Sequence, residues 1–224
     1  MMDKAMQSGS SATGSKRPAD HSRQRAKQAR AIETNAQLLD AATELFSTKG
    51  FEGTSVRQIE EHASVQRGLL AYHFGNKDSM WRAVVDRIFG GLKADMTGRI
   101  DVLTDVAPAE AAPALLRAFV RYSASHPALN RMIMQESVSA GWRIEYFVHD
   151  HIRPLLDSFQ VVAGASRQTN EEAAQFYYLL VGAGAFIFSV EHECEALFGF
   201  NPRSEDFVEK YAENLARLMY PPKT

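Results

Sequence analysis

The stretch from Thr54 to Met80 carries side chains whose chemistry suits contact with a nucleic acid. Arg67 can donate two parallel hydrogen bonds to guanine, and the amide of Gln66 can read the edge of a base. Leu69 and Ala71 are apolar groups that can meet a thymine methyl group. Hydroxyls, a cation and free backbone N–H groups at the start of a helix suit phosphate oxygens, and this predicts phosphate contacts from Thr54, Ser55 and Arg57. For any one of these residues alone, a solvated polar surface is the competing interpretation.

Positioning these side chains requires two short helices joined by a tight turn. Val56, Ile59 and Ala63 recur at helical spacing, which predicts a first helix beginning at Thr54 or Ser55. Ser55 and the glutamine three residues later have the spacing of a capping box. The pattern then breaks over residues 63–65, as expected for the turn.

The second helix is expected from Gln66 to His73, with Leu70 facing inward and its neighbours exposed. Phe74-Gly75 ends it, and Asn76 is a suitable cap for the helix that follows. Two short helices with this connection form a helix-turn-helix, whose second helix fits the major groove of DNA.

The residues Thr54-Ser55-Val56-Arg57-x-Ile59, followed by Val65-x-Arg67-Gly68-x-Leu70-x-Tyr72-His73-Phe74-x-Asn76-Lys77-Asp78, resemble the DNA-binding domain of TetR/AcrR-type transcriptional regulators. The resemblance is strongest from about residue 32 to residue 85. It implies that Gly68, Tyr72 and His73 belong to the DNA-contacting helix and that Lys77 is the phosphate-binding lysine of the family.

Four residues depart from the family pattern within this unit. Ser64 stands where glycine is usual, so a residue with a side chain has to tolerate an unusual backbone angle. Glu60 stands where alanine is usual, and its methylene groups are expected to carry the carboxylate outward. Ala71 replaces a common aromatic residue and Gln66 replaces a common serine cap. These differences bear on which DNA is bound.

Charge is unevenly distributed along the 224 residues, although the net charge is only −2. Residues 1–30 hold seven Lys or Arg against two Asp. Residues 1–29 lack aromatic residues and are expected to be disordered. They form either a solvated tail or a basic arm that contacts phosphates or enters a minor groove, with the basic side chains of Arg23, Arg25, Lys27 and Arg30.

The remainder of the chain is expected to be entirely helical. A helix from residue 31 or 34 to 49 braces the helix-turn-helix, and a long helix over 77–99 connects it to the body. Further helices are expected over 109–125, 128–139, 141–163, 171–197 and 204–219, with Pro154 kinking the third of these. The predicted fold is all-α with about nine helices: a basic arm (1–29), a three-helix DNA-binding head (30–80), and an effector-binding and dimerisation domain (81–224).

Aromatic and polar side chains in the body suggest a pocket for a largely apolar or aromatic small molecule. Plain core packing is the competing interpretation for each candidate. The predicted lining residues are Phe119, Tyr122, Met132, Glu136, Trp142, Tyr146, His149 and Tyr178.

The segment from Phe176 to Val190 is apolar nearly all round, so the helix must be buried on more than one side. A second copy of the chain can cover one side, and the resemblance also implies a homodimer with a four-helix interface. The predicted interface residues are Tyr177, Val181, Gly184, Phe188, Val208, Tyr211 and Leu215.

We find no motif that indicates catalysis, a metal or a cofactor. The histidines at 149 and 151 and the run Glu191-His192-Glu193-Cys194 lack the spacing that would bring ligands together on a helix. A single cysteine, Cys194, and no N-terminal apolar run lead us to expect a cytoplasmic protein.

The sequence therefore predicts a homodimeric, ligand-responsive transcriptional regulator, most readily a repressor that binds a pseudo-palindromic operator and is released by a small-molecule effector. Two alternatives remain open: a constitutive DNA-binding dimer without an effector, and a helical small-molecule enzyme with a vestigial DNA-binding head.

Overall fold

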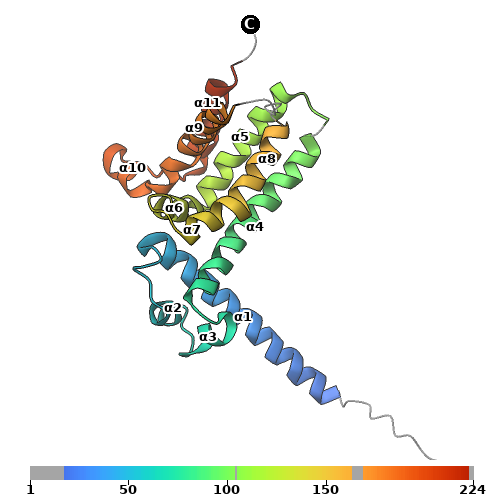
Figure 1. The fold of residues 1–224 in the computed structure, drawn as a ribbon, viewed down its shortest axis with the longest axis vertical. Helices are drawn as coiled ribbons and strands as arrows, with labels where there is room; N and C mark the ends of the chain where they lie inside the picture. Colours follow the sequence, from blue (N-terminus) through green and yellow to red (C-terminus); the bar gives the residue numbers. More distant parts are fainter. Residues whose placement is uncertain (1–17, 104, 163–168, 222–224) are drawn as a thin grey trace, which may run out of the picture.

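The computed structural model describes residues 18–103, 105–162 and 169–221, and within these ranges every regular element is a helix. This confirms the all-α prediction. Figure 1 shows a small head at one end, a helical body at the other, and α4 running between them. The elements are α1 (Pro18–Lys49), α2 (Val56–His62), α3 (Leu69–Phe74), α4 (Lys77–Leu103), α5 (Pro108–Ser125), α6 (Pro127–Glu136), α7 (Trp142–Tyr146), the π-helix η1 (Phe147–Ile152), α8 (Arg153–Val162), α9 (Asn170–Ser189), α10 (Glu191–Phe198) and α11 (Glu205–Met219).

Helix α1 is longer than the sequence pattern predicted. It begins at Pro18 and not near residue 31, so residues 18–29, which were expected to be disordered, are helical. Proline is well tolerated in the first turn of a helix, and the alanine, glutamine, lysine and arginine residues that follow are good helix formers. The first half of α1 projects away from the head (Figure 1). The part of the predicted arm before Pro18 lies outside the described residues.

The head is built on the second half of α1, with α2 and α3 packed against it and against the start of α4. Its core contains buried aliphatic and aromatic side chains, and burial of each leucine, isoleucine, methionine or phenylalanine contributes about 1.5–3 kcal/mol relative to exposure. The buried core residues are Leu38, Ala42, Leu45, Phe46, Ile59, Leu70, Met80 and Trp81.

One apolar cluster runs without a break from the head into the body. Helix α4 carries it, because Val84 and Val85 are buried near the head while Phe89, Leu92 and Met96 are buried in the body. The prediction that this helix connects the two parts agrees with its position in Figure 1. A change of packing in the body can therefore reach the head through buried side chains of one helix.

Helix α5 is the centre of the body and packs against α4, α9 and α11. Its contact with α9 is close because α9 carries Gly184 at the crossing. A Cβ atom added there would lie 2.8 Å from the ring of Phe119, so a larger residue would force the two helices apart.

The segment predicted as one helix over 141–163 is divided into α7, the π-helix η1 and α8. The predicted disturbance at Pro154 takes the form of a π-helical segment immediately before it. Proline lacks a backbone N–H and crowds the preceding turn of an α-helix, and a wider turn accommodates it.

The expected helix over 171–197 is also divided, with α9 and α10 meeting at 73°. Arg131 holds this corner: its Nε donates to the carbonyl of Ser189 at 2.9 Å and its Nη2 lies 3.0 Å from the carboxylate of Glu191. Burial opposes ionisation of Glu191, but hydrogen bonds from Arg131 and Arg203 outweigh it and lower its pKa.

Among the described residues no single helix is long and apolar enough to span a membrane. Helices α9 and α10 taken together have sufficient length and hydropathy, but they are bent by 73° at their junction.

Candidate nucleic-acid interface and ligand cavity

Helix α2 begins with the predicted capping box, which the structure confirms. The backbone N–H of Ser55 donates to the side-chain oxygen of Gln58 at 2.8 Å, and the backbone N–H of Gln58 donates to the hydroxyl of Ser55 at 3.2 Å. The turn after α2 contains Ser64 at φ 55°, in the left-handed region, as its replacement of glycine led us to expect. These two local features set where the second helix of the unit begins.

Glu60 lies inside the unit, and the expectation that its carboxylate points outward is wrong. The residue is 4% exposed, and its Oε1 accepts hydrogen bonds from the backbone N–H groups of Gly68 at 2.8 Å and Leu70 at 3.0 Å. Gly68, in the left-handed region at φ 88°, precedes α3 and supplies no side-chain cap. The carboxylate of Glu60 therefore binds the free N–H groups at the start of α3 from the preceding helix.

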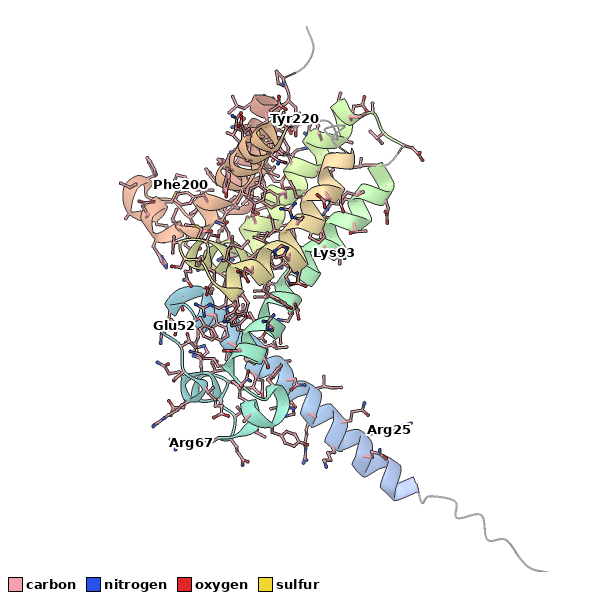
Figure 2. The ribbon with its side chains drawn as sticks, viewed as in Figure 1. Arg25, Glu52, Arg67, Lys93, Phe200 and Tyr220 are labelled. Carbon is pink, nitrogen blue, oxygen red and sulfur yellow. The ribbon has the colours of Figure 1, made fainter. Side chains whose placement is uncertain are left out.

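Helix α3 presents one face to solvent while Leu70 is fully buried. Tyr72 is 76% exposed, and the side chain of Arg67, just before the helix, is 72% exposed. In Figure 2 Arg67 projects at the end of the head that faces away from the body. Of the residues predicted to contact DNA, those on the surface in or beside α3 are Gln66, Arg67, Gly68, Ala71 and Tyr72, with Leu69 and His73 partly exposed.

Two of the predicted phosphate contacts are structural residues. Thr54 is 1% exposed, and its hydroxyl donates to the carbonyls of Gly50 at 2.8 Å and Leu45 at 3.2 Å. The ammonium group of Lys77 donates to the carbonyls of Phe51 at 3.0 Å and Thr54 at 3.1 Å and lies 4.0 Å from the centre of the Phe51 ring. Both side chains hold the loop before α2 in place. Thr54 is buried, so its assignment to DNA is corrected, whereas the half-buried Lys77 has a third N–H in its ammonium group and its phosphate contact stays a prediction.

A carboxylate lies among the exposed cations of the head. Arg57 is bound to Glu61 at 2.7 Å on the same face of α2, and Arg67 lies 3.9 Å from the same oxygen. The hydrogen bond from Arg57 lowers the pKa of Glu61. The pKa of Arg57 is raised in return. Glu61 therefore stays ionised near neutral pH and competes with phosphate for both arginines.

The body contains an apolar cavity between α4, α5, α6, α8 and α9, with a volume of about 70 Å³. Aliphatic and aromatic side chains form most of its wall, together with the polar side chains of Ser123, His126, Asn130 and Tyr177. Of the residues predicted to line a pocket, only Phe119 lines this cavity.

The other predicted pocket residues have different positions. Tyr122 donates to the carbonyl of Ile88 and borders a separate open groove beside α1. Met132 is packed in the core, whereas His149 is exposed and Tyr178 is 72% exposed. Helical spacing alone did not distinguish these orientations.

The remaining three predicted pocket residues lie at the junction of head and body. Trp142 packs edge-on against Trp81 with ring centres 5.2 Å apart, and the guanidinium of Arg82 lies 4.5 Å from its ring. The hydroxyl of Tyr146 donates to Asp86 at 2.5 Å. Glu136 binds Arg143 at 2.6 Å.

The predicted dimer contacts are also corrected, because most of them face the core of their own chain. Tyr177 and Val181 line the cavity, and the hydroxyl of Tyr211 donates to the carbonyl of Ala183 at 2.6 Å. The others, Gly184, Phe188, Val208 and Leu215, are buried. The opposite face of α9 and the end of α11 expose large apolar side chains, namely Tyr178, Leu179, Phe186 and Leu218.

Comparison with known proteins places these features in a family. Residues 38–84 match the model of the bacterial regulatory proteins of the tetR family. The chain is 24% identical over 198 residues to the HTH-type transcriptional regulator RutR of Escherichia coli K12, covering 86% of this chain and 92% of that protein. It is 43% identical over 56 residues to an HTH-type transcriptional repressor of Mycobacterium tuberculosis, covering 25% of this chain and 30% of that one.

The fold is also similar to that of AibR, solved with isovaleryl coenzyme A and operator DNA. The TM-score is 0.61 and the identity 19%, with 85% of this chain and all of AibR (100%) covered. The matched head, the helix-turn-helix geometry and the all-helical body agree, and the chain belongs to the TetR family of helix-turn-helix transcriptional regulators.

Proposed function

We propose that this regulator binds a pseudo-palindromic operator as a homodimer, represses transcription there, and is released by a small molecule bound in its body. The observation that carries the proposal is the exposed surface at α3, where Arg67 and Tyr72 are solvent-accessible while Leu70 anchors the helix in the core. An arginine with this exposure suits a guanine edge, and a tyrosine hydroxyl suits a phosphate.

We assign DNA binding and effector binding to separate parts of the chain. Residues 30–80 form the DNA-binding head, residues 81–224 form the effector-binding and dimerisation domain, and the basic N-terminal stretch, helical from Pro18, supplements the head. AibR, which shares the fold, was solved with both operator DNA and an acyl coenzyme A. That precedent supports a body that binds a small molecule in a chain whose head binds DNA.

Dimerisation is assigned to the apolar face that the single chain leaves exposed. Phe186 is 44% exposed, Leu179 61% and Tyr178 72% on α9, and Leu218 is 79% exposed on α11. Two copies of these helices would bury the exposed face in a four-helix arrangement. The dimer would present two copies of α3, and each would read one half of a palindromic site.

For a ligand to release DNA, a change at the cavity has to reach the head. Side-chain contacts at the junction of head and body link the two. Phe89 lines the cavity and stacks on His151 with ring centres 4.7 Å apart. His151 lies 3.1 Å from Asp86, which also accepts the hydrogen bond from Tyr146. A ligand that displaces Phe89 would therefore disturb α7, which packs against Trp81 at the base of the head.

The proposal is tested by DNA binding to the region upstream of the gene and its neighbours, measured by footprinting and fluorescence anisotropy at several salt concentrations. We expect a two-fold symmetric footprint that Arg67→Ala weakens by roughly ten- to a hundredfold, equivalent to 1–3 kcal/mol. Arg99→Ala, which removes an exposed arginine of the body paired with Asp95, is the matched control and should bind normally.

The alternatives give different results in the same experiments. A constitutive DNA-binding dimer would give the footprint but would bind no small molecule that changes it. An enzyme with a vestigial head would show no sequence-selective, salt-dependent DNA binding, and this result would overturn the proposal.

A further inference from the structure

The body cavity contains hydrogen-bonding groups that have no partner among the described residues. Ser123 is 6% exposed and lines the cavity, and no described residue accepts from or donates to its hydroxyl. Tyr177 lines the same cavity, and its hydroxyl likewise forms no hydrogen bond to the described part of the chain. Buried polar groups in folded proteins nearly always have a partner. Tyr177 is half-buried and neither hydroxyl is fully enclosed, so each can bond to a water or to a ligand oxygen that enters the cavity.

Asn130 adds a third group of the same kind. It is 7% exposed, and its amide nitrogen donates to the hydroxyl of Ser189 at 2.7 Å and contacts the sulfur of Met134 at 3.3 Å. With the amide in this orientation, no described residue donates a hydrogen bond to its carbonyl oxygen. The cavity wall thus offers an acceptor and two hydroxyls, each of which can donate or accept.

The cavity offers no full charge to a ligand, because no lysine, arginine, aspartate or glutamate of the described residues lines it. Burial raises the pKa of Tyr177 to about 12, with a further contribution from Tyr178, so its hydroxyl remains a neutral donor at physiological pH. An ion placed among these side chains would lose its hydration without gaining a counter-ion, which is a large penalty. A neutral group with one oxygen would instead complete the hydrogen bonds of the wall.

We propose that the cavity binds a compact, uncharged and mostly apolar molecule that carries a hydrogen-bonding oxygen, with Ser123, Asn130 and Tyr177 as its polar partners. This inference rests on the proposed function, since it names the class of effector that the body takes. The cavity volume of about 70 Å³ is smaller than the ~150 Å³ of an engineered cavity that holds benzene in another protein. The ligand is accordingly small, or the surrounding helices move apart to admit a larger one.

His126 is the residue at which an anionic ligand would bind in place of a neutral one. It is exposed at the rim, stacks on Tyr122 with ring centres 4.0 Å apart, and places Nδ1 near the hydroxyl of Ser125 at 2.9 Å. A carboxylate at the rim could approach this imidazole, whereas a neutral oxygen inside the cavity would meet Ser123 and Tyr177. The two arrangements predict opposite orders of affinity for neutral and anionic probes.

The test is an NMR titration of the full-length protein with butan-2-one, pentane, butanoate and butylammonium, which are similar in size and differ in polarity and charge. We expect butan-2-one to bind most tightly, with the two ions at least about tenfold weaker because their charge is not compensated. Ser123→Ala and Tyr177→Phe should each weaken butan-2-one by roughly three- to tenfold, as the loss of one hydrogen bond does, and leave pentane unchanged. Tyr178→Phe, which removes an exposed hydroxyl from the adjacent residue, is the matched control and should change neither.

Two results would overturn the inference: equal or tighter binding of butanoate, and the absence of saturable binding by any of the four probes. Operator binding is measured in parallel without any probe, so failure of the site and failure of the DNA-binding proposal are separate results. If butan-2-one binds with the expected pattern but its addition does not change the affinity for the operator, the ligand site is confirmed and release of DNA by this ligand is excluded.

Discussion

The guanidinium of Arg143 lies 4.3 Å from the centre of the Phe51 ring, so a side chain from α7 of the body rests on the loop that precedes α2 in the head. The same guanidinium binds Glu136 at 2.6 Å and lies 3.3 Å from Glu52. Stacking and ion pairing at a single planar group make this contact directional, because both depend on the orientation of the guanidinium plane. The head therefore has a defined orientation relative to the body in this conformation.

Replacing Arg143 should loosen that orientation. We expect Arg143→Ala to lower the free energy of unfolding by about 2–3 kcal/mol, because Glu136 would lose its partner in a largely buried position. Arg143→Lys preserves the charge but not the planar stack, and should recover only part of the loss. Urea denaturation of the three proteins measures the difference. A fully stable Arg143→Lys variant would show that the charge alone matters.

Glu60 should be required for the position of α3. We expect Glu60→Ala to lower the free energy of unfolding by about 1–3 kcal/mol, since the partly buried N–H of Gly68 and the buried N–H of Leu70 would lose their acceptor. Operator affinity should fall as well, while Glu60→Gln should retain much of both because it keeps an oxygen in place. Glu33→Gln, an exposed change on α1, is the control. Denaturation and anisotropy measure the two effects, and unchanged operator binding by a folded Glu60→Ala variant would contradict the assignment.

Removing Glu61 should strengthen DNA binding. The carboxylate is fully ionised near neutral pH, since its pKa is lowered by Arg57, and it occupies the arginine that could otherwise bind phosphate. We expect Glu61→Gln to increase affinity for unrelated DNA and to steepen the salt dependence by about one unit of log–log slope. Asp95→Asn, which frees Arg99 in the body, should leave the slope unchanged. An unchanged slope in Glu61→Gln would remove Arg57 from the interface.

His151 should make the protein less stable in acid. Burial lowers its pKa more than the nearby carboxylates of Asp86 and Asp150 raise it, so the folded state favours the neutral imidazole. The unfolded chain therefore takes up the proton first as the pH falls, and stability present above the ordinary histidine pKa is lost below it. His151→Gln should reduce the difference in stability between about pH 5.5 and pH 7.5, whereas His149→Gln, at an exposed neighbour, should not. An identical pH profile in His151→Gln would contradict this origin.

The dimer face can be tested by charge. Phe186→Glu, on the exposed side of α9, should convert a dimer into a folded monomer in sedimentation experiments, because a carboxylate would be buried at the interface. Leu215→Glu, at a residue of α11 that is 7% exposed, should instead unfold the chain. A stable Phe186→Glu dimer would require a different interface.

The head was the more predictable part of the molecule. Its signals are local: the capping pair of Ser55 and Gln58, and the alternation of exposed residues around Leu70, are both read within one or two turns of the chain. Glu60 was the exception, because its orientation depends on N–H groups eight and ten residues later, at Gly68 and Leu70. The presence of a charged residue at an otherwise apolar position indicated that Glu60 has a hydrogen-bond partner inside the protein.

The helices of the body could be predicted from the sequence, but the side of each helix that is buried could not. Adjacent residues on a helix differ by about 100° in direction, so Tyr177 faces the cavity and Tyr178 faces solvent. Helix α9 is apolar on most sides, and its sequence contains no polar stripe from which the rotation can be inferred. The cavity and dimer predictions for residues of α9 failed for that reason, while the helical content and the order of the segments were predicted.

The π-helix η1 between α7 and α8 contains more residues per turn than the α-helices on either side. If η1 became α-helical, the residues of α7 would shift in register by one residue relative to α8. Such a slip corresponds to a rotation of about 100°. Tyr146 would swing away from Asp86, Trp142 would leave the ring of Trp81, and Arg143 would withdraw from Phe51. A single change of helical register in the body would thus disengage every one of these contacts at once.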